Sequence, residues 1–367
     1  MTAFVESCVQ TTAGEAAKVD RRARGKPRAA KLLRLLADKK KILLTTHVHP
    51  DPDALASTLG LCHLLSSRLK DAQVHMSIKG QIGGGINEAF TRHTPLALVP
   101  WNERSLKDYD AVILLDVQPT FAYSPLPAGF VPTAVIDHHM SGSHKPRCPF
   151  CDIRPDVGAT SSIIFSYFME LEEKILPELG ATLLFAIETD LAGAAGQPDT
   201  LDNIALSGLT LIADMRKLYQ MRYVDVPQSY FVAVATALAN ATYYEQAMVS
   251  HLGTIDSLEK PAVLADFLLR FDKVQWSLTT AISDDRMVVS LRTNNPNHSA
   301  GELMRRMMAS LGEGGGHRTK AGGYVKLESG SAAEIERVRN KLRQRFLRAL
   351  KIKPNSRGQK LVPGKLE

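Results

Sequence analysis

The chain is poor in cysteine, with only Cys8, Cys62, Cys148 and Cys151 among its 367 residues. So few thiols argue against a disulfide framework and favour a reducing, cytoplasmic location. Cys148 and Cys151 do have metal-ligand spacing, and His144 lies just upstream. A structural zinc site usually needs four ligands. A plain loop is therefore the favoured interpretation of this segment, with zinc as the alternative.

Long apolar runs are also missing. No stretch approaches the roughly 18 consecutive apolar residues that a membrane-spanning helix needs, so no membrane partner is expected. The N-terminal segment lacks the continuous apolar core of a secretory signal. The glycine-rich segment 80–85 is not followed by Lys-Ser or Lys-Thr, which argues against a P-loop and favours a turn.

Acidic residues are scarce at the C-terminal end, where most of the net charge of +7 is located. From Glu334 onward, eleven Lys or Arg residues face three acidic residues. Apolar residues at helical spacing predict an amphipathic helix over 332–350, and the Pro- and Gly-containing segment after it is expected to be disordered. This charge is interpreted as a solvated helix face and tail, or alternatively as an electrostatic contact with a polyanion.

The length of the chain and its 44% hydrophobic content predict two domains with their own cores. Strands expected at 41–46, 74–78, 111–115 and 133–136 alternate with helical segments, which predicts an α/β fold with a doubly wound, mainly parallel sheet. A β-pair over 274–292 and a helix over 301–311 indicate a second, smaller α/β domain. The expected division is a flexible basic leader at 1–29, a metal-binding domain at 30–200, a helical connector at 201–245, the smaller domain at 246–350 and a disordered basic tail at 351–367.

Four clusters of acidic residues or histidines each follow a short apolar run. They are the segment from His47 to Asp53, Asp116, the segment 137–139 with sequence Asp-His-His, and Asp190. The runs suit buried strands of an open sheet, although the fourth, at 183–187, could equally be a helix. Such sheets bind ligands at the carboxyl ends of their strands. Because carboxylates gathered there repel one another, the pattern predicts a pair of divalent cations and a two-metal hydrolase.

These residues carry a family resemblance. His47-x-His49-Pro50-Asp51-Pro52-Asp53, then Asp116, Asp137-His138-His139 and Asp190, resembles the four-motif signature of the DHH phosphoesterase superfamily. The segment Gly314-Gly315-Gly316-His317 resembles the glycine-rich motif of the associated DHHA1 domain. The resemblance covers roughly residues 40–325 and is most similar to the nanoRNase/pAp-phosphatase group of bifunctional oligoribonucleases. Pro52 and Lys320 depart from the usual glycine and alanine of this pattern.

The resemblance implies a role for each metal-binding residue. One cation would be held by His47, Asp51 and Asp116, and the other by Asp53, Asp116, His138 and Asp190, so that Asp116 bridges the two. Mixed imidazole and carboxylate ligands favour Mn²⁺, with Mg²⁺ as the alternative. His139 is placed toward the substrate phosphate, and Asp137 is expected to orient a neighbouring histidine. Asp116, Asp137, His138 and His139 are the expected catalytic residues, and His49 is interpreted as a loop residue.

A phosphate site is expected in the second domain. The glycines Gly314, Gly315 and Gly316 would let backbone N–H groups approach a phosphate closely, and His317 adds a donor. Positive charge is expected from Arg292, Arg318 and Lys320. The two domains would then form the walls of a cleft that closes around substrate.

The function expected from this reasoning is manganese-dependent hydrolysis of short RNA fragments, or of 3′-phosphoadenosine 5′-phosphate (pAp), to nucleoside 5′-monophosphates. The alternatives are a phosphodiesterase of cyclic or linear dinucleotides, a pyrophosphatase or exopolyphosphatase, and a regulatory protein that binds nucleotides or RNA without turnover. No protein partner is indicated, and a homodimer is left open.

Overall fold

The computed structural model describes residues 27–80, 82, 86–141, 146–192, 198–316 and 318–363. The chain divides into a first unit that ends at Val224 and a second unit that begins at Asp225. The expected basic leader lies almost wholly outside the described residues, and the first described helix starts at its last two residues. No helix in the described ranges has both the length and the apolar character needed to span a bilayer.

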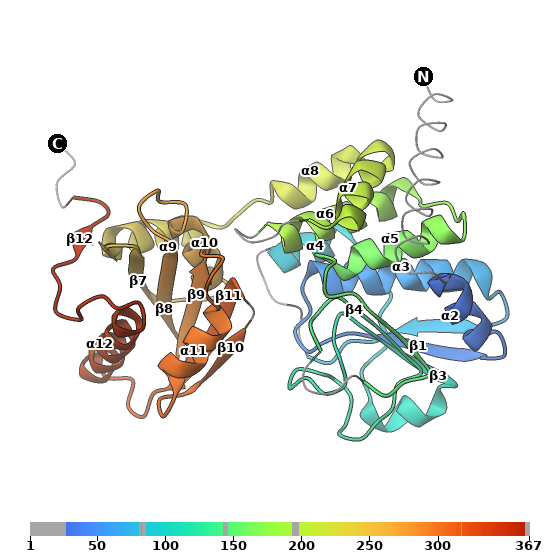
Figure 1. The fold of residues 1–367 in the computed structure, drawn as a ribbon, viewed down its shortest axis with the longest axis horizontal. Helices are drawn as coiled ribbons and strands as arrows, with labels where there is room; N and C mark the ends of the chain where they lie inside the picture. The colour runs from blue at the N-terminus through green and yellow to red at the C-terminus, as the bar shows by residue number, and fades with distance from the viewer. Residues whose placement is uncertain are drawn as a thin grey trace. The chain divides into compact units, whose positions relative to one another are not determined.

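The first unit begins with α2 (Arg28–Leu36) and carries a five-stranded sheet (Figure 1). Its strands are β1 (Lys41–Thr45), β2 (Gln73–Met76), β3 (Ala111–Leu115), β4 (Ala134–Asp137) and β5 (Phe150–Ile153). Its other helices are α3 (Pro52–Arg68), α4 (Ile86–His93), the 3-10 helix η1 (Glu103–Asp108), α5 (Thr160–Glu170), α6 (Pro177–Leu191), α7 (Thr200–Ile212) and α8 (Met215–Arg222).

The sheet of the first unit has the strand order β2-β1-β3-β4-β5, and every neighbouring pair is parallel. This confirms the predicted parallel sheet. Alternate side chains of each strand enter different cores. Ile42 and Leu44 pack under the α-helices, whereas Leu43 packs with Leu106 of η1 on the opposite face. Because both faces are covered, the three central strands β1, β3 and β4 consist of almost continuous apolar runs.

The fourth apolar run, at 183–187, lies in a helix rather than a strand. Pro177 occupies the first turn of α6, where its missing N–H costs nothing, and the run is buried on all sides. Asp190 therefore comes from the last turn of a helix. The other three clusters begin at the ends of strands or in the loops that follow them, and the first continues into α3, whose first turn contains Asp53.

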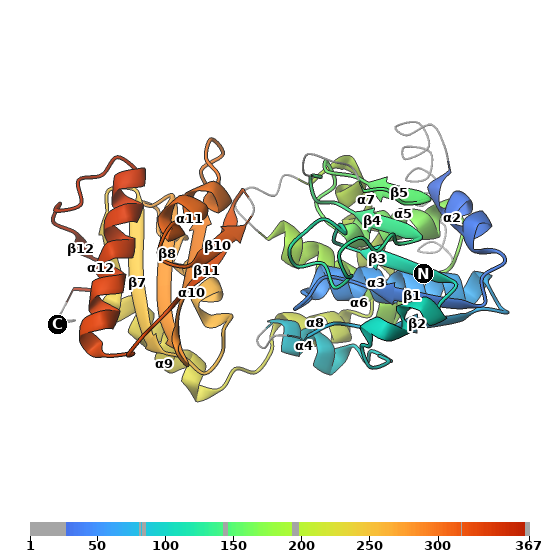
Figure 2. The same ribbon diagram turned by 90° about the horizontal axis from the view of Figure 1, so that it is seen from below.

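The second unit is built on a seven-stranded mixed sheet of order β10-β11-β9-β8-β7-β6-β12 (Figure 2). Its strands are β6 (Thr242–Tyr244), β7 (Ala247–Thr254), β8 (Trp276–Ser283), β9 (Arg286–Thr293), β10 (Glu313–Gly316), β11 (Lys320–Lys326) and β12 (Gln359–Lys360). Helices α11 (Ala300–Met308) and α12 (Ala332–Ala349) pack on one face, and α9 (Gln228–Asn240) and α10 (Lys260–Leu268) on the other.

Two expectations about the chain's organisation are corrected. The expected helical connector at 201–245 is not a separate element, because α7 and α8 belong to the first unit while α9 and β6 belong to the second. The tail at 351–367 is not disordered over its described part, since β12 pairs antiparallel with β6 and Ile352 is buried. The edge of β6 offers unpaired backbone groups, and this pairing satisfies them. The amphipathic helix predicted at 332–350 is confirmed as α12.

Candidate metal centre

The predicted metal-binding side chains gather at one edge of the first unit's sheet. His47 and Asp51 follow β1, Asp116 follows β3 and His138 follows β4, and these three strands are neighbours in the order β1-β3-β4. Because the strands are parallel, their carboxyl ends meet at this edge. The last turn of α6 adds Asp190, whose Oδ2 lies 3.4 Å from His138 Nε2. The structure thus brings together residues that are separated by more than a hundred positions in the sequence.

The first group of potential ligands contains His47, Asp51 and Asp116, whose donor atoms lie within 4.8 Å of one another. His47 Nε2 is 3.7 Å from Asp116 Oδ2 and 4.0 Å from Asp51 Oδ1. His47 Nδ1 lies 3.1 Å from the carbonyl of Val48. A proton on Nδ1 leaves the Nε2 lone pair directed at the two carboxylates, as metal ligation requires.

A second group contains Asp53, His138 and Asp190, again within 4.8 Å. His138 Nδ1 lies 3.2 Å from the carbonyl of Val157, which leaves Nε2 free to bind a cation. The same Nε2 lies 3.5 Å from Asp116 Oδ1. Asp116 therefore presents Oδ2 to the first group and Oδ1 to the second, which is the geometry of a bridging ligand.

The N-terminus of α5 holds two of these carboxylates in place. The backbone N–H groups of Thr160 and Ser161 donate to Asp53 at 2.7 and 2.8 Å. The Thr160 hydroxyl donates to Asp116 Oδ1 at 2.7 Å. Helix N-termini favour negative charge because their first N–H groups have no partners within the helix. The sequence indicates only that a helix starts near Thr160, and it does not show that this helix start faces Asp53 and Asp116.

Asp116 is held in an uncommon backbone conformation. Its φ is 58°, in the left-handed region that non-glycine residues rarely adopt, although aspartate tolerates it better than most. Such strain costs on the order of 1–3 kcal/mol and clusters at functional sites. The conformation turns the chain at the end of β3, where one carboxylate oxygen of Asp116 faces His47 and the other faces His138.

Two carboxyl groups of the centre, those of Asp53 and Asp116, have raised pKa values. Burial and the charge of Asp190 raise the pKa of Asp53 to about 7, despite the two backbone N–H donors. Burial and the charge of Asp53 also raise the pKa of Asp116. Like charges gathered in a buried site penalise one another's ionised forms. The donor set therefore fits divalent cations, whose charge would remove this penalty.

A neighbouring pair, Asp137 and His139, borders the centre. Asp137 Oδ1 lies 2.7 Å from His139 Nδ1, and the Gln118 amide donates to Asp137 Oδ2 at 2.7 Å. Burial opposes ionisation of both side chains, but their mutual hydrogen bond and charges prevail, lowering the pKa of Asp137 and raising that of His139. His139 Nδ1 is 3.8 Å from Asp116 Oδ1. Asp116, His138 and His139 also form a group whose donor atoms lie within 4.8 Å of one another, and Asp137 orients His139 within it.

The three glycines of the glycine-rich motif, Gly314, Gly315 and Gly316, lie in strand β10, although glycine by itself favours a turn. In β10, Gly314 pairs with Gly323 of β11 and Gly315 pairs with Gly322. A Cβ on Gly314 would come within 2.8 Å of the Met304 side chain, so the α11 side of this strand has no room for one. Cross-strand packing therefore overrides the low strand propensity of glycine. His317 lies outside the described residues.

The predicted basic residues lie on or just before the strands β9 and β11, which follow β10 in the sheet. Arg292 on β9 pairs in register with Lys320 on β11. The Arg292 guanidinium forms an ion pair with Asp266 of α10, with Nε 3.0 Å from Oδ1, so part of its charge is already balanced. Arg318 donates to the carbonyl of Pro296.

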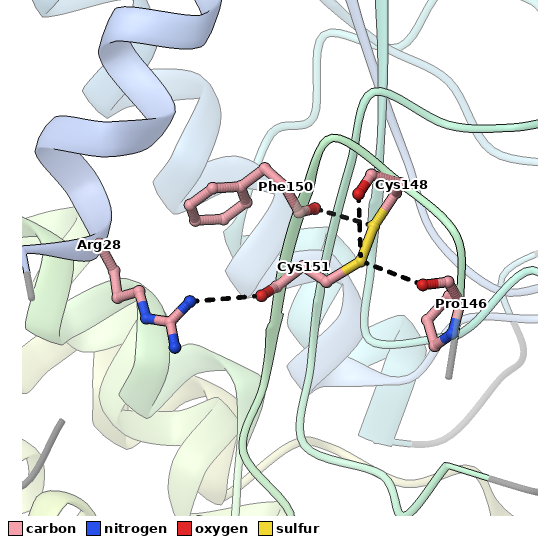
Figure 3. The surroundings of a disulfide bond; sticks show 5 residues. All are labelled: Arg28, Pro146, Cys148, Phe150 and Cys151. Atoms are coloured by element: carbon pink, nitrogen blue, oxygen red, sulfur yellow. Dashed lines mark hydrogen bonds between the residues drawn. A yellow bond between two sulfur atoms is a disulfide. The ribbon is translucent and has the colours of Figure 1, made fainter. Parts of the chain in front are cut away.

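Cys148 and Cys151 are joined by a disulfide bond (Figure 3). This corrects the expectation of a plain loop, and it also removes the thiolates that the zinc alternative would need. Figure 3 further shows the Arg28 guanidinium donating to the carbonyl of Cys151, at 3.5 Å. His144, the third potential zinc ligand, lies outside the described residues.

The chain is similar in sequence to two kinds of known protein. Over 327 residues the chain is 27% identical to an uncharacterized protein of Methanocaldococcus jannaschii, covering 89% of this chain and 66% of that protein. Over 152 residues it is 26% identical to a probable manganese-dependent inorganic pyrophosphatase of Staphylococcus aureus, covering 41% of this chain and 48% of that protein. The chain thus spans less than two thirds of the length of these relatives.

A solved structure has the same fold. An exopolyphosphatase-related protein of Bacteroides fragilis superimposes with a TM-score of 0.67 at 19% identity, covering 88% of this chain and 97% of that chain. The model of the DHH family N-terminal domain matches residues 41–187. This range contains all the grouped ligands except Asp190, which follows three residues later. Residues 41–187 of this chain therefore match the DHH family, N-terminal domain.

Proposed function

We propose that this protein is a phosphoesterase of the nanoRNase/pAp-phosphatase type, which hydrolyses short oligoribonucleotides or pAp to nucleoside 5′-monophosphates with the help of two divalent cations. The observation that carries the proposal is the position of Asp116. Its Oδ2 faces His47 and its Oδ1 faces His138, at 3.7 and 3.5 Å. A carboxylate between two sets of nitrogen and oxygen donors is the arrangement that two-metal phosphoester hydrolysis requires.

The residues that would hold the cations are His47, Asp51, Asp53, Asp116, His138 and Asp190. Mixed imidazole and carboxylate donors favour Mn²⁺ over Mg²⁺, and the name of the Staphylococcus aureus relatives records manganese dependence. When bound, divalent cations supply the Lewis acidity that polarises a phosphoryl group and lowers the pKa of an attacking water.

The chain's own residues have separate tasks in this reaction. His47 and His138 each use Nδ1 to contact a backbone carbonyl, which fixes the ring and leaves Nε2 available. Thr160 holds Asp116 through a hydroxyl hydrogen bond, so the bridging carboxylate cannot rotate freely. His139, whose pKa is raised by Asp137 despite burial, suits a charged hydrogen bond to a phosphate oxygen of the substrate.

The second unit is proposed to hold a phosphate of the substrate that is not cleaved. The described glycines of β10, together with Arg292, Arg318 and Lys320, offer backbone N–H groups and positive charge near one end of the sheet. His317 is included in this proposal on the sequence motif alone. Substrates with a phosphate beyond the scissile bond would gain affinity and alignment from these contacts.

A second candidate is hydrolysis of pyrophosphate or polyphosphate, which the match of 41% of the chain to probable inorganic pyrophosphatases favours. A phosphodiesterase of cyclic or linear dinucleotides would use the same centre. A binding protein without turnover is disfavoured by the complete donor sets around Asp116.

A substrate panel with added manganese tests the proposal. The panel contains pAp, RNA dinucleotides to pentanucleotides, pApA, cyclic di-AMP and pyrophosphate, and release of nucleoside monophosphate or phosphate is measured. We expect AMP from pAp or from the short RNAs, and no product with Asp116→Ala, whose circular dichroism should remain that of the folded protein. Turnover of pyrophosphate alone would refute the nucleotide proposal, and activity of Asp116→Ala within tenfold of the wild type would refute the bridging role.

A further inference from the structure

The first unit contains an apolar pocket outside the metal centre. It has a volume of about 540 Å³, within the ~300–1,000 Å³ typical of small-molecule sites. The pocket is lined by Ile78, Gly80, Ile82, Leu98, Val99, Pro100 and Trp101. Among the described lining residues, the indole N–H of Trp101 is the one polar side-chain group. The described part of the lining therefore has almost no group that would recognise a phosphate or a sugar.

Gly80, in the wall of the pocket, lies next to the loop between His47 and Asp51. Ile78 and Gly80 follow β2, which pairs directly with β1, the strand that leads to His47 (Figure 2). Gly80 has φ +94°, and a Cβ placed on it would lie 3.2 Å from Val48 Cγ1 and 3.4 Å from a ring carbon of His49. One wall of the pocket thus contacts the loop between His47 and Asp51, and any larger residue at position 80 would press against that loop.

Two features of the lining favour a flat aromatic ligand. Trp101 packs against the buried core of the sheet on one side, which holds the indole in place while it borders the pocket. Leu98 remains 38% exposed, so apolar surface at the rim still contacts water. Lys79 and Glu103 form an ion pair at 3.6 Å, and each of them lies within two positions in the sequence of a residue that lines the pocket. An apolar floor with polar groups close by suits a base, which has an apolar face and a polar edge.

We propose that this pocket binds a nucleobase of the substrate, stacked on Trp101, while the phosphoester of the same substrate lies at the metal centre. The inference rests on the proposed function and narrows it, because pyrophosphate and polyphosphate contain no group that an apolar pocket could recognise. Base stacking on an aromatic side chain is independent of base identity. The pocket therefore selects nucleotides over inorganic phosphates without selecting a sequence.

Intrinsic fluorescence tests the pocket directly. The chain has two tryptophans, Trp101 and Trp276, and Trp276 is only 1% exposed. At constant manganese, AMP should quench the emission of the wild-type protein, whereas ribose 5-phosphate and inorganic phosphate should not. The quenching by AMP should disappear in Trp101→Phe, in which only Trp276 emits. Equal emission changes with AMP and ribose 5-phosphate would overturn the proposal.

Calorimetric titration of AMP supplies the second measurement. Trp101→Ala should weaken binding about 5- to 150-fold, the range expected for losing one stacked base, while Trp101→Phe should remain near the wild type. Val131→Ala is the control, because Val131 is an exposed apolar residue outside the pocket. The two proposals can fail separately. Hydrolysis of pAp with no loss of AMP affinity in Trp101→Ala overturns the pocket alone, whereas Trp101-dependent AMP binding without turnover supports the pocket and refutes the proposed function.

Discussion

The hydrogen bond from Thr160 to Asp116 allows a sharp test of how the centre is organised. The hydroxyl lies 2.7 Å from Asp116 Oδ1, both groups are buried, and the donor comes from the first residue of α5. Thr160→Val removes the hydroxyl and keeps the shape of the side chain. The backbone N–H that Thr160 donates to Asp53 remains in the variant. The substitution therefore isolates one contact to Asp116, the proposed bridging carboxylate.

The size of the effect follows from the burial of this contact. A hydrogen bond to a charged group contributes about 1.5–3 kcal/mol, which corresponds to roughly a 10- to 150-fold change in an equilibrium constant. Second-layer partners of metal ligands typically change metal affinity or activity by about 10- to 100-fold. Because Thr160 is inaccessible to solvent, water cannot replace the lost donor. We therefore expect Thr160→Val to weaken manganese binding and to lower kcat/KM by about 10- to 100-fold.

Manganese affinity is measured by calorimetry and kcat/KM on the substrate found in the panel. Thr160→Ser keeps the hydroxyl and should stay close to the wild type. Thr58→Val is the matched control, since Thr58 is also buried but donates to the carbonyl of Ala54 within α3. The reasoning is refuted if Thr160→Val and Thr58→Val show the same metal affinity, because the loss would then come from replacing any buried hydroxyl.

Three further predictions concern the histidine pair, the second unit and its stability. His138→Ala should lose bound metal, whereas His139→Ala should keep its metal and lose rate; equal metal contents in the two purified variants would contradict this division. Arg292→Ala should lower kcat/KM on pAp about 10- to 1000-fold but spare bis(p-nitrophenyl) phosphate, and parallel losses would place Arg292 at the reacting centre or in the fold. Backbone N–H donors from the preceding turn lower the pKa of Glu334 to about 2, so its contribution to stability is present above the unfolded pKa of about 4.3 and is lost as the pH falls toward 2. The denaturant midpoint of the wild type should fall as the pH is lowered from about 4.3 to 2, and the difference in midpoint between the wild type and Glu334→Gln should shrink over the same range. A difference in midpoint that stays constant over this pH range would exclude a stabilising role for the ionised Glu334 side chain.

Much of the candidate site could be read from the order of residues along the chain. His47, Asp116 and His138 each follow an apolar run that is too short for a helix and is bounded by polar residues. Because parallel strands place their carboxyl ends at one edge, this local pattern was enough to predict that the three side chains meet. The helical period of the C-terminal segment likewise predicted α12 almost to the residue.

Other features depended on contacts between distant segments. Thr160 meets Asp116 across 44 positions, and nothing in the local sequence indicates which helix start will face which carboxylate. Glycine propensity favours a turn at Gly314, yet pairing with β11 makes a strand there. The low apolar content of the tail predicted disorder, but the free edge of β6 pairs with it. Local propensities amount to tenths of a kcal/mol per residue for most side chains. The secondary structure of such segments is therefore determined by a hydrogen-bonded neighbouring strand or by packing against another element. These neighbours exist only once the chain has folded.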